Sequence, residues 1–340
     1  MTHSMTRFGV GVAAALVGTL QILSVVQVWD HPYAGYLADS SRVVRQVAPG
    51  SPAERAGITV GDRITRIGSI AADDTRAFDA QPRAQIGESR EIAIDRGNQQ
   101  VVAHLTYEGL PAMGVIGYLA SSLTGISFLA FGVWAMARIP RASTTLLALA
   151  GIGLGAAFVN MPYFESPTAR AVQDALLVPI ALFGFVFLLH FTLVFPSPKR
   201  LTASRFALPA IYGLPALIAA GYLLAAWFGG GRSNGLGASL LTAALVVVIL
   251  AFALSVVALA HGYARATSSL RSAWGLNVLL ASIVLGLAPI IATAVALIAP
   301  QVMLPGSEFY DVVWVLIPFA LARAAILQAR AAAPGQAGSR

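Results

Sequence analysis

Long apolar stretches alternate with short polar segments along most of the chain. They occupy residues 8–29, 113–137, 144–160, 173–195, 206–228, 238–260, 274–299 and 310–329. About 20 apolar residues in a helix are needed to cross the hydrocarbon core of a bilayer. The pattern therefore predicts a membrane α-helical bundle of about eight transmembrane helices, of which the span at 144–160 is the shortest.

The segment between the first two stretches has a different pattern. Residues 30–112 hold short apolar alternations separated by Gly, Pro and Asp, which is typical of short strands. Strands are expected at 41–47, 62–67, 91–96 and 101–105. Ser51 is expected to cap a short helix that Gly57 ends, and Gly97-Asn98 predicts a hairpin turn. A further helix is expected over 75–85, interrupted by Pro82.

Composition supports this division of the chain. The sequence is 57% hydrophobic and 11% charged, whereas soluble domains are about a quarter charged, so a water-soluble enzyme is excluded. The expected parts are an N-terminal anchor (1–29), an inserted α+β domain (30–112), a seven-helix bundle (113–330) and a cytoplasmic tail (331–340). The chain has no cysteine, which excludes disulfides and thiolate metal sites.

The distribution of charge predicts the orientation in the membrane. With the N-terminus inside, the cytoplasmic segments carry 11 basic residues and no acid, and the short outer loops carry only Arg170 and Arg232. This is the asymmetry of the positive-inside rule. Both termini are therefore expected in the cytoplasm and the domain at 30–112 outside. The net charge of +7 lacks a basic run, so nucleic acid is not an expected partner.

Two neighbouring runs in the inserted domain carry a resemblance. The residues from Val47 to Ile58 (VAPGSPAERAGI) and from Val60 to Ile64 (VGDRI) resemble the signature of bacterial PDZ domains, and the similarity extends over about 33–107. PDZ domains add an extended peptide or a C-terminus as a strand at a sheet edge. The resemblance implies a bacterial inner-membrane protein with a periplasmic PDZ domain.

The same resemblance implies a peptide-binding site. Its loop and edge strand map onto Tyr33, Ala34, Gly35, Tyr36, Leu37 and Ala38, with Phe78 on the facing helix lining a side-chain pocket. Backbone N–H groups around Gly35 would hold a terminal carboxylate. Substituting Gly35 is expected to weaken peptide binding without affecting the fold. Ala38 stands where a second glycine is frequent, and a PDZ fold used only for packing or dimerisation remains an alternative.

The membrane spans show no pattern of a catalytic site. None of the five histidines belongs to an H-E-x-x-H motif, no serine-protease constellation is evident, and no chain of acids crosses the bilayer. No catalytic residue, metal or cofactor is therefore expected. His190 and Asn277 are the intramembrane polar candidates, and hydrogen bonds to neighbouring helices are the expected role for both.

A second resemblance concerns the helical region. Residues 189–196 (LHFTLVFP) and 314–327 (WVLIPFALARAAIL) resemble the multi-span N-terminal sensor regions of bacterial membrane histidine kinases, some of which carry an outer PDZ domain after the first span. The residues after the last span are expected to be a disordered tail without the kinase.

These observations together predict a non-catalytic inner-membrane sensor or scaffold. Its periplasmic PDZ domain would bind a protein C-terminus or an extended peptide, and the bundle would contact lipid and a membrane signalling partner. The alternatives are a transporter or lipid-handling protein that the PDZ domain regulates, and an atypical membrane protease.

Overall fold

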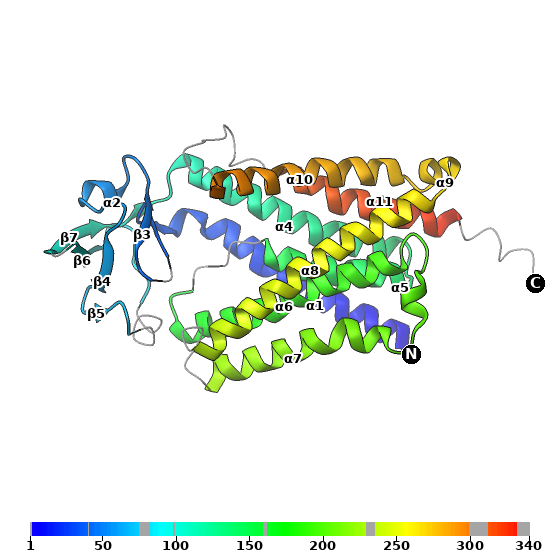
Figure 1. Cartoon of the computed structure of the whole chain (residues 1–340), viewed down its shortest axis with the longest axis horizontal. Coiled ribbons are helices and arrows are strands. Elements are labelled where there is room, and N and C mark those ends of the chain that lie inside the picture. Colours follow the sequence, from blue (N-terminus) through cyan, green and yellow to red (C-terminus); the bar gives the residue numbers. More distant parts are fainter. Residues whose placement is uncertain are drawn as a thin grey trace, which may run out of the picture.

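Apolar helices form a bundle, and a small β-rich domain lies beyond one of its ends (Figure 1). The computed structural model describes residues 2–39, 41–74, 82–97, 99–158, 162, 164–228, 235–298 and 312–331. The apolar helices are α1 (Thr2–Val26), α4 (Ala112–Arg138), α5 (Ala142–Ala157), α6 (Pro167–Val194), α7 (Ala207–Phe228), α8 (Gly235–Arg265), α10 (Leu276–Ile298) and α11 (Leu316–Ala331). Short helical segments follow three of them: η1 (Gln27–Asp30) after α1, η2 (Arg200–Ala203) after α6 and α9 (Ser268–Ala273) after α8.

Each of the eight expected apolar stretches overlaps one of these helices. Six helical segments are long and apolar enough to cross a membrane, at 4–30, 112–138, 167–194, 207–228, 235–265 and 312–331. Two further apolar helices, at 142–157 and 276–289, are shorter. The membrane bundle is therefore supported through six candidate spans, and eight crossings remain a prediction.

The shortest expected span forms one of the most enclosed helices of the bundle. Helix α5 packs against α1, α4, α6 and α11, and every residue from Ala150 to Ala156 is buried. Glycines permit this close approach. A Cβ placed on Gly153 would lie 2.3 Å from the Cα of Gly184 on α6, and one on Gly151 would lie 2.4 Å from the carbonyl oxygen of Phe128 on α4. A helix that is apolar all round is expected at such a central position.

The two segments that resemble sensor regions, residues 189–196 and 314–327, contact each other. Phe191 and Phe195 belong to the same buried cluster as Leu321 and other α11 residues. The Gln328 side-chain amide also donates a hydrogen bond to the Pro196 carbonyl oxygen at 2.6 Å. The end of α6 is therefore fixed to α11 by both apolar packing and a polar contact.

The β-rich domain contains the strands that the alternating pattern predicts. Its elements are β1 (Pro32–Tyr33), β2 (Tyr36–Ala38), β3 (Val44–Val47), α2 (Pro52–Arg55), β4 (Arg63–Ile67), β5 (Ile70–Ala71), β6 (Ser89–Arg96), β7 (Gln99–Thr106) and β8 (Glu108–Gly109). One antiparallel sheet has the order β5-β4-β6-β7, and β2 pairs with β3 in a second. Val44, Ile58, Ile92 and Leu105 belong to its core, which is separate from the clusters of the bundle.

The expected helix over 75–85 cannot be followed in full. Residues 75–81, including Phe78, lie outside the described residues, and residues 82–85 form neither helix nor strand. The hairpin is confirmed, because β6 and β7 pair in register on either side of Gly97, whose φ is +61°.

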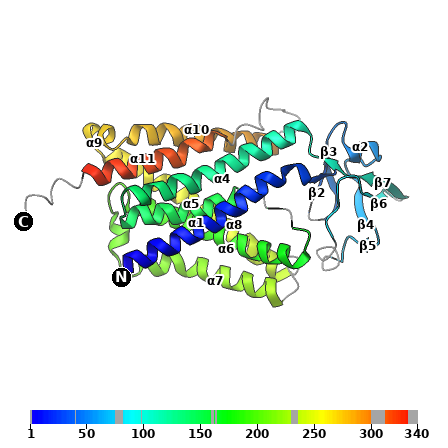
Figure 2. The ribbon, with the colours of Figure 1, turned by 180° about the vertical axis from the view of Figure 1, so that it is seen from behind.

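Two chain segments join the domain to the bundle and pair with each other. In the β1–β8 ladder Tyr33 is opposite Glu108, so the entry and exit strands form one short ribbon. Just below it the Tyr118 hydroxyl of α4 lies 2.6 Å from the Ser24 hydroxyl of α1, and the His31 and Tyr118 rings meet edge to face. Figure 2 shows that α1 begins and α11 ends at the far end of the bundle from this domain.

Candidate peptide-binding site

Strand β2 is the element on which the predicted peptide site depends. One of its edges pairs with β3, with Tyr36 opposite Val47 and Leu37 opposite Gln46. Within the described part of the chain no strand pairs with the other edge of β2. An unpaired edge offers the N–H and C=O groups that an added peptide strand needs.

The loop before β2 is held by its carbonyl groups. The Ala34 oxygen accepts from Ala53 N at 2.9 Å, and the Gly35 oxygen accepts from Ala48 N at 2.8 Å. In a trans peptide the N–H points opposite to the C=O of the same unit. The Ala34 carbonyl points toward α2, so the N–H of Gly35 points away from α2. The Gly35 carbonyl points toward the end of β3, so the N–H of Tyr36 points away from β3, on the side of the open edge of β2.

Gly35 has a structural role that its position in the sequence does not reveal. Its φ is +84°, which L side chains rarely adopt, and a Cβ placed on it would lie 2.1 Å from the Cβ of Ser51. Ser51 is buried, caps α2 through a bond from Glu54 N, and donates to the Gly35 oxygen at 3.3 Å. The expectation that a Gly35 substitution leaves the fold unaffected is therefore wrong.

The predicted site residues have different surroundings. Ala34 and Tyr36 pack against the core of the domain, and burial raises the pKa of the Tyr36 hydroxyl. Leu37 is 64% exposed, and Ala38 is exposed beside a register shift in the ladder. Tyr33 is half-buried in β1 and belongs to the ribbon that joins the domain to the bundle. Residues 35–38 are therefore the predicted site residues that lie at or next to the unpaired edge of β2.

The turn after β2 is organised by a residue that sequence analysis did not select. The Asp39 carboxylate accepts hydrogen bonds from Ser41 N at 2.8 Å and Val43 N at 3.0 Å, and it forms an ion pair with Arg45 at 2.5 Å. The hydrogen bond from Val43 N, with smaller contributions from Arg45, lowers the pKa of this carboxyl. The carboxylate therefore stabilises the β2–β3 turn, and with it the strand that the peptide would join.

The Gly-Asp pair of the signature also has a structural explanation. Only 1% of the Asp62 side chain is exposed, and its carboxylate accepts two bonds from the Arg96 guanidinium, each 2.8 Å, and one from Thr59 N at 2.7 Å. The Arg96 hydrogen bond lowers the pKa of Asp62. The turn before β4 is thereby fixed to the end of β6. The pairing of Asp62 with Arg96 depends on the fold and cannot be predicted from their positions in the sequence.

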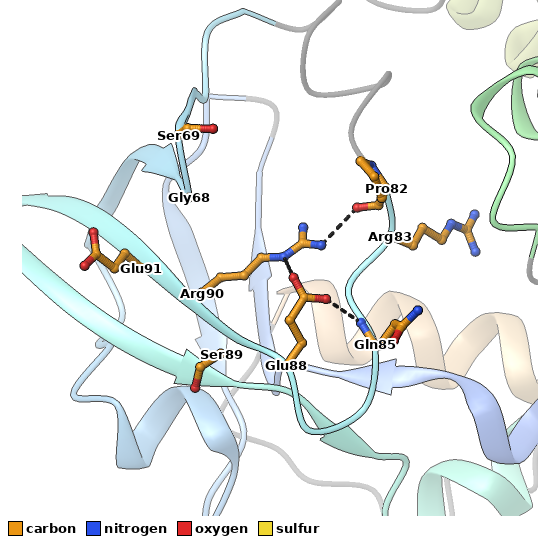
Figure 3. A pocket seen from close by; sticks show the side chains of 9 residues that line it. All are labelled: Gly68, Ser69, Pro82, Arg83, Gln85, Glu88, Ser89, Arg90 and Glu91. Atoms are coloured by element: carbon orange, nitrogen blue, oxygen red, sulfur yellow. Dashed lines mark hydrogen bonds and ion pairs between the residues drawn. The ribbon is translucent and has the colours of Figure 1, made fainter.

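A cavity of about 470 Å³ lies between the start of β6 and the loop that leads to it (Figure 3). Arg90 extends across it, donating from Nε to Glu88 at 2.6 Å and from Nη2 to the Pro82 oxygen at 3.0 Å. Glu88 also accepts from Gln85 N at 2.8 Å. These bonds attach the loop to the sheet. The polar side chains of the cavity wall therefore serve to hold the domain together.

Both intramembrane polar candidates form contacts between helices. His190 Nδ1 on α6 lies 2.7 Å from the Tyr212 hydroxyl on α7. The Tyr263 hydroxyl on α8 donates to Asn277 Oδ1 on α10 at 3.0 Å. Each residue thus has the kind of hydrogen-bonded neighbour that sequence analysis expected for it.

Comparison with known proteins identifies the class of the inserted domain. The family model described as "PDZ domain" matches residues 43–95. This segment includes the short helix, the Gly-Asp turn and the first three strands of the larger sheet. The chain therefore contains a PDZ domain, and the recognition of its signature is confirmed.

Two relatives share only a part of this chain. Over 69 residues the chain is 42% identical to "Putative serine protease HhoB" of Synechocystis sp., covering 19% of this chain and 16% of that protein. Over 83 residues it is 36% identical to "26S proteasome non-ATPase regulatory subunit 9" of Drosophila melanogaster, covering 22% and 36%. The chain thus spans well under half of either relative.

Proposed function

We propose that this protein is a non-catalytic sensor or scaffold of the bacterial inner membrane, whose periplasmic PDZ domain binds a protein C-terminus or an extended peptide. The observation that carries the proposal is the open edge of β2 next to the outward N–H groups of Gly35 and Tyr36. Strand addition supplies affinity through main-chain hydrogen bonds, and the N–H groups would hold the terminal carboxylate.

The connection between the domain and the bundle suits such a role. The β1–β8 ribbon and the Ser24–Tyr118 contact attach the domain to α1 and α4 together. Tyr33 ends β1 two residues before Gly35, so a peptide on β2 would lie close to the membrane end of the domain. A membrane signalling partner would then receive the binding event through the bundle.

The peptide site can be tested on the full-length protein in detergent. A library of peptides with free C-termini is screened, and one binder is compared with its C-terminally amidated form by calorimetry. Amidation removes the charge and leaves strand pairing possible, so affinity should fall by about 1–3 kcal/mol. Equal affinity for the two forms would reject carboxylate capture, and a library without any binder would reject the peptide site.

The proposed orientation has a separate test. Reporter fusions after Gly97 and Pro305 should report the periplasm, and fusions after Arg141, Arg200 and Ser269 should report the cytoplasm. This expectation rests on the excess of basic residues in the connections at the end of the bundle far from the PDZ domain. A fusion after Arg141 that reports the same side as one after Gly97 would contradict the orientation.

A further inference from the structure

A small apolar crevice lies between α8 and α10, toward the end of the bundle that is far from the PDZ domain. Pro196, Leu259 and Tyr263 line one side, and Leu276, Leu279 and Ile283 line the other. Its volume is about 40 Å³, so it holds only a small apolar segment, and a longer ligand would extend along the outer surface of the two helices. Helix α10 packs more extensively against α11 than against α8, so the two walls meet only locally.

A polar group marks one end of this crevice. The Tyr263 hydroxyl and the Asn277 amide oxygen join α8 to α10 at 3.0 Å. The short helix α9 follows α8 in the chain and brings Arg271 over the Tyr263 ring, with the guanidinium carbon 4.4 Å from the ring centre. A cation and an amide thus border an apolar surface.

The second cation lies at the Pro196 side. Lys199 Nζ donates to the Thr192 and Phe195 oxygens, both at 2.7 Å. A Cβ placed on Gly262 would lie 2.6 Å from Pro196 Cδ and 3.7 Å from Lys199 Nζ. Lys199 therefore lies against the wall that Pro196 forms.

Both cations retain hydrogen-bond donors. Arg271 uses Nε for the Tyr263 oxygen and Nη2 for the Ala264 oxygen, which occupies two of the five N–H groups of a guanidinium. Lys199 uses two of the three donors of an ammonium group. Each can therefore donate to at least one more acceptor.

This part of the chain contains no acid that could neutralise the two cations. The sequence has no Asp or Glu between Asp174 and Glu308. Five ion pairs with a carboxylate lie between Asp39 and Glu108, within the PDZ domain and its flanking strands. The complementary charge must therefore come from outside the bundle.

We propose that this crevice binds an anionic phospholipid, with an acyl chain along α8 and α10 and the phosphate at Lys199 and Arg271. Basic pockets between transmembrane helices bind anionic headgroups at the cytoplasmic face. The apolar walls match the chain, and the remaining donors of the two cations match the phosphate oxygens. The lipid site is independent of the peptide site.

The test uses purified full-length protein in a non-ionic detergent. Native mass spectrometry measures the retention of phosphatidylglycerol and of phosphatidylcholine with identical acyl chains. The unsubstituted protein should retain the anionic lipid preferentially. Lys199→Gln and Arg271→Gln should each lower its retention about fivefold. Arg200→Gln is the matched control, because this exposed arginine lies in η2, close to Lys199 in the chain, and does not line the crevice.

A second variant separates lipid binding from folding. Lys199 and Arg271 also hold helix ends, whereas Ala260 is an exposed residue of the crevice wall. Ala260→Phe should occupy the crevice and lower retention of the anionic lipid while the melting temperature stays unchanged. Equal retention of both lipids by the unsubstituted protein, an equal loss in Arg200→Gln, or full retention in a folded Ala260→Phe would each overturn the proposal.

Discussion

The PDZ domain and the helical bundle use different interactions to hold similar close contacts. In the domain, carboxylates are paired and hydrogen-bonded: Asp39 with Arg45, and Asp62 with Arg96. In the bundle, α4, α5 and α6 approach through glycines such as Gly153 and Gly184.

The difference follows from the surroundings of each region. Water solvates the unpaired parts of a partly exposed carboxylate such as Asp39, and the buried carboxylate of Asp62 is compensated by its hydrogen bonds, so each can hold a turn at low cost. Lipid gives no such solvation, and helices in it associate through close packing of small residues. The domain should therefore respond to charge, and the bundle should respond to side-chain volume.

The largest effect is expected from added volume at the centre of the bundle. Gly153→Leu places a side chain where the Cα of Gly184 lies 2.3 Å from the new Cβ, so α5 and α6 must separate. We expect a loss of about 3 kcal/mol or more, measured as a lower melting temperature and aggregation in detergent. Gly213→Leu is the control, since a Cβ there meets nothing within 4 Å. Equal melting of the two variants would contradict the role of volume.

The next prediction separates the cost of backbone strain at a positive φ from the cost of a steric clash inside the PDZ domain. Gly35 and Gly57 both have positive φ, +84° and +77°, but only a Cβ on Gly35 meets Ser51. Gly57→Ala should cost about 1 kcal/mol for the backbone alone, and Gly35→Ala about 3 kcal/mol with the added clash. Hydrogen exchange in β3 of the full-length protein measures both. Similar losses would show that Ser51 moves away freely.

The sequence predicts the domain signature well because that signature is local. Ser51 as the cap of α2 and Gly57 at its end each act within a few residues, and both are confirmed. Contacts across the chain were not predictable in the same way. The Asp62–Arg96 pair and the Gly35–Ser51 contact join residues that no spacing rule connects.

The helical region shows the same limit. Hydropathy predicts where the apolar helices lie, because length and polarity are local properties. It does not reveal that the short helix α5 packs against four other helices, since neighbours depend on how the bundle closes. The assignment of Phe78 to the peptide pocket lies outside the described residues and stays a prediction.

A smaller effect tests the charge dependence of the domain. Asp62→Asn removes the charge that Arg96 pairs with and should cost about 2 kcal/mol at pH 7. The pKa of Asp62 is lowered in the folded state, so its contribution is present above its ordinary value of about 3.9 and is lost as pH falls through the folded value. The difference between the two proteins should therefore shrink below about pH 4.

The measurement is hydrogen exchange in β4 and β6, corrected for the intrinsic rate at each pH. Asp95→Asn is the matched control, because this exposed carboxylate lies next to Arg96 in the chain and no ion pair with it occurs among the described residues. A loss of protection in Asp62→Asn that stays constant from pH 7 to pH 3 would contradict the charge pairing.

The smallest effect concerns the junction where the two regions meet. Tyr118→Phe keeps the ring that contacts His31 but removes the hydroxyl that bonds both the Ser24 hydroxyl, at 2.6 Å, and the Ser24 carbonyl oxygen, at 3.1 Å. Hydrogen bonds between transmembrane helices average about 0.6 kcal/mol, so amides of the β1–β8 ribbon should exchange about threefold faster. Ser24→Ala should have less effect, because the bond to the carbonyl oxygen remains possible.

Protection in the β6–β7 hairpin should not change in either variant, since the core of the PDZ domain is separate from the clusters of the bundle. An equal loss in that hairpin would mean that the domain and the bundle unfold as one unit, and the contrast between their interactions would not then extend to their stabilities.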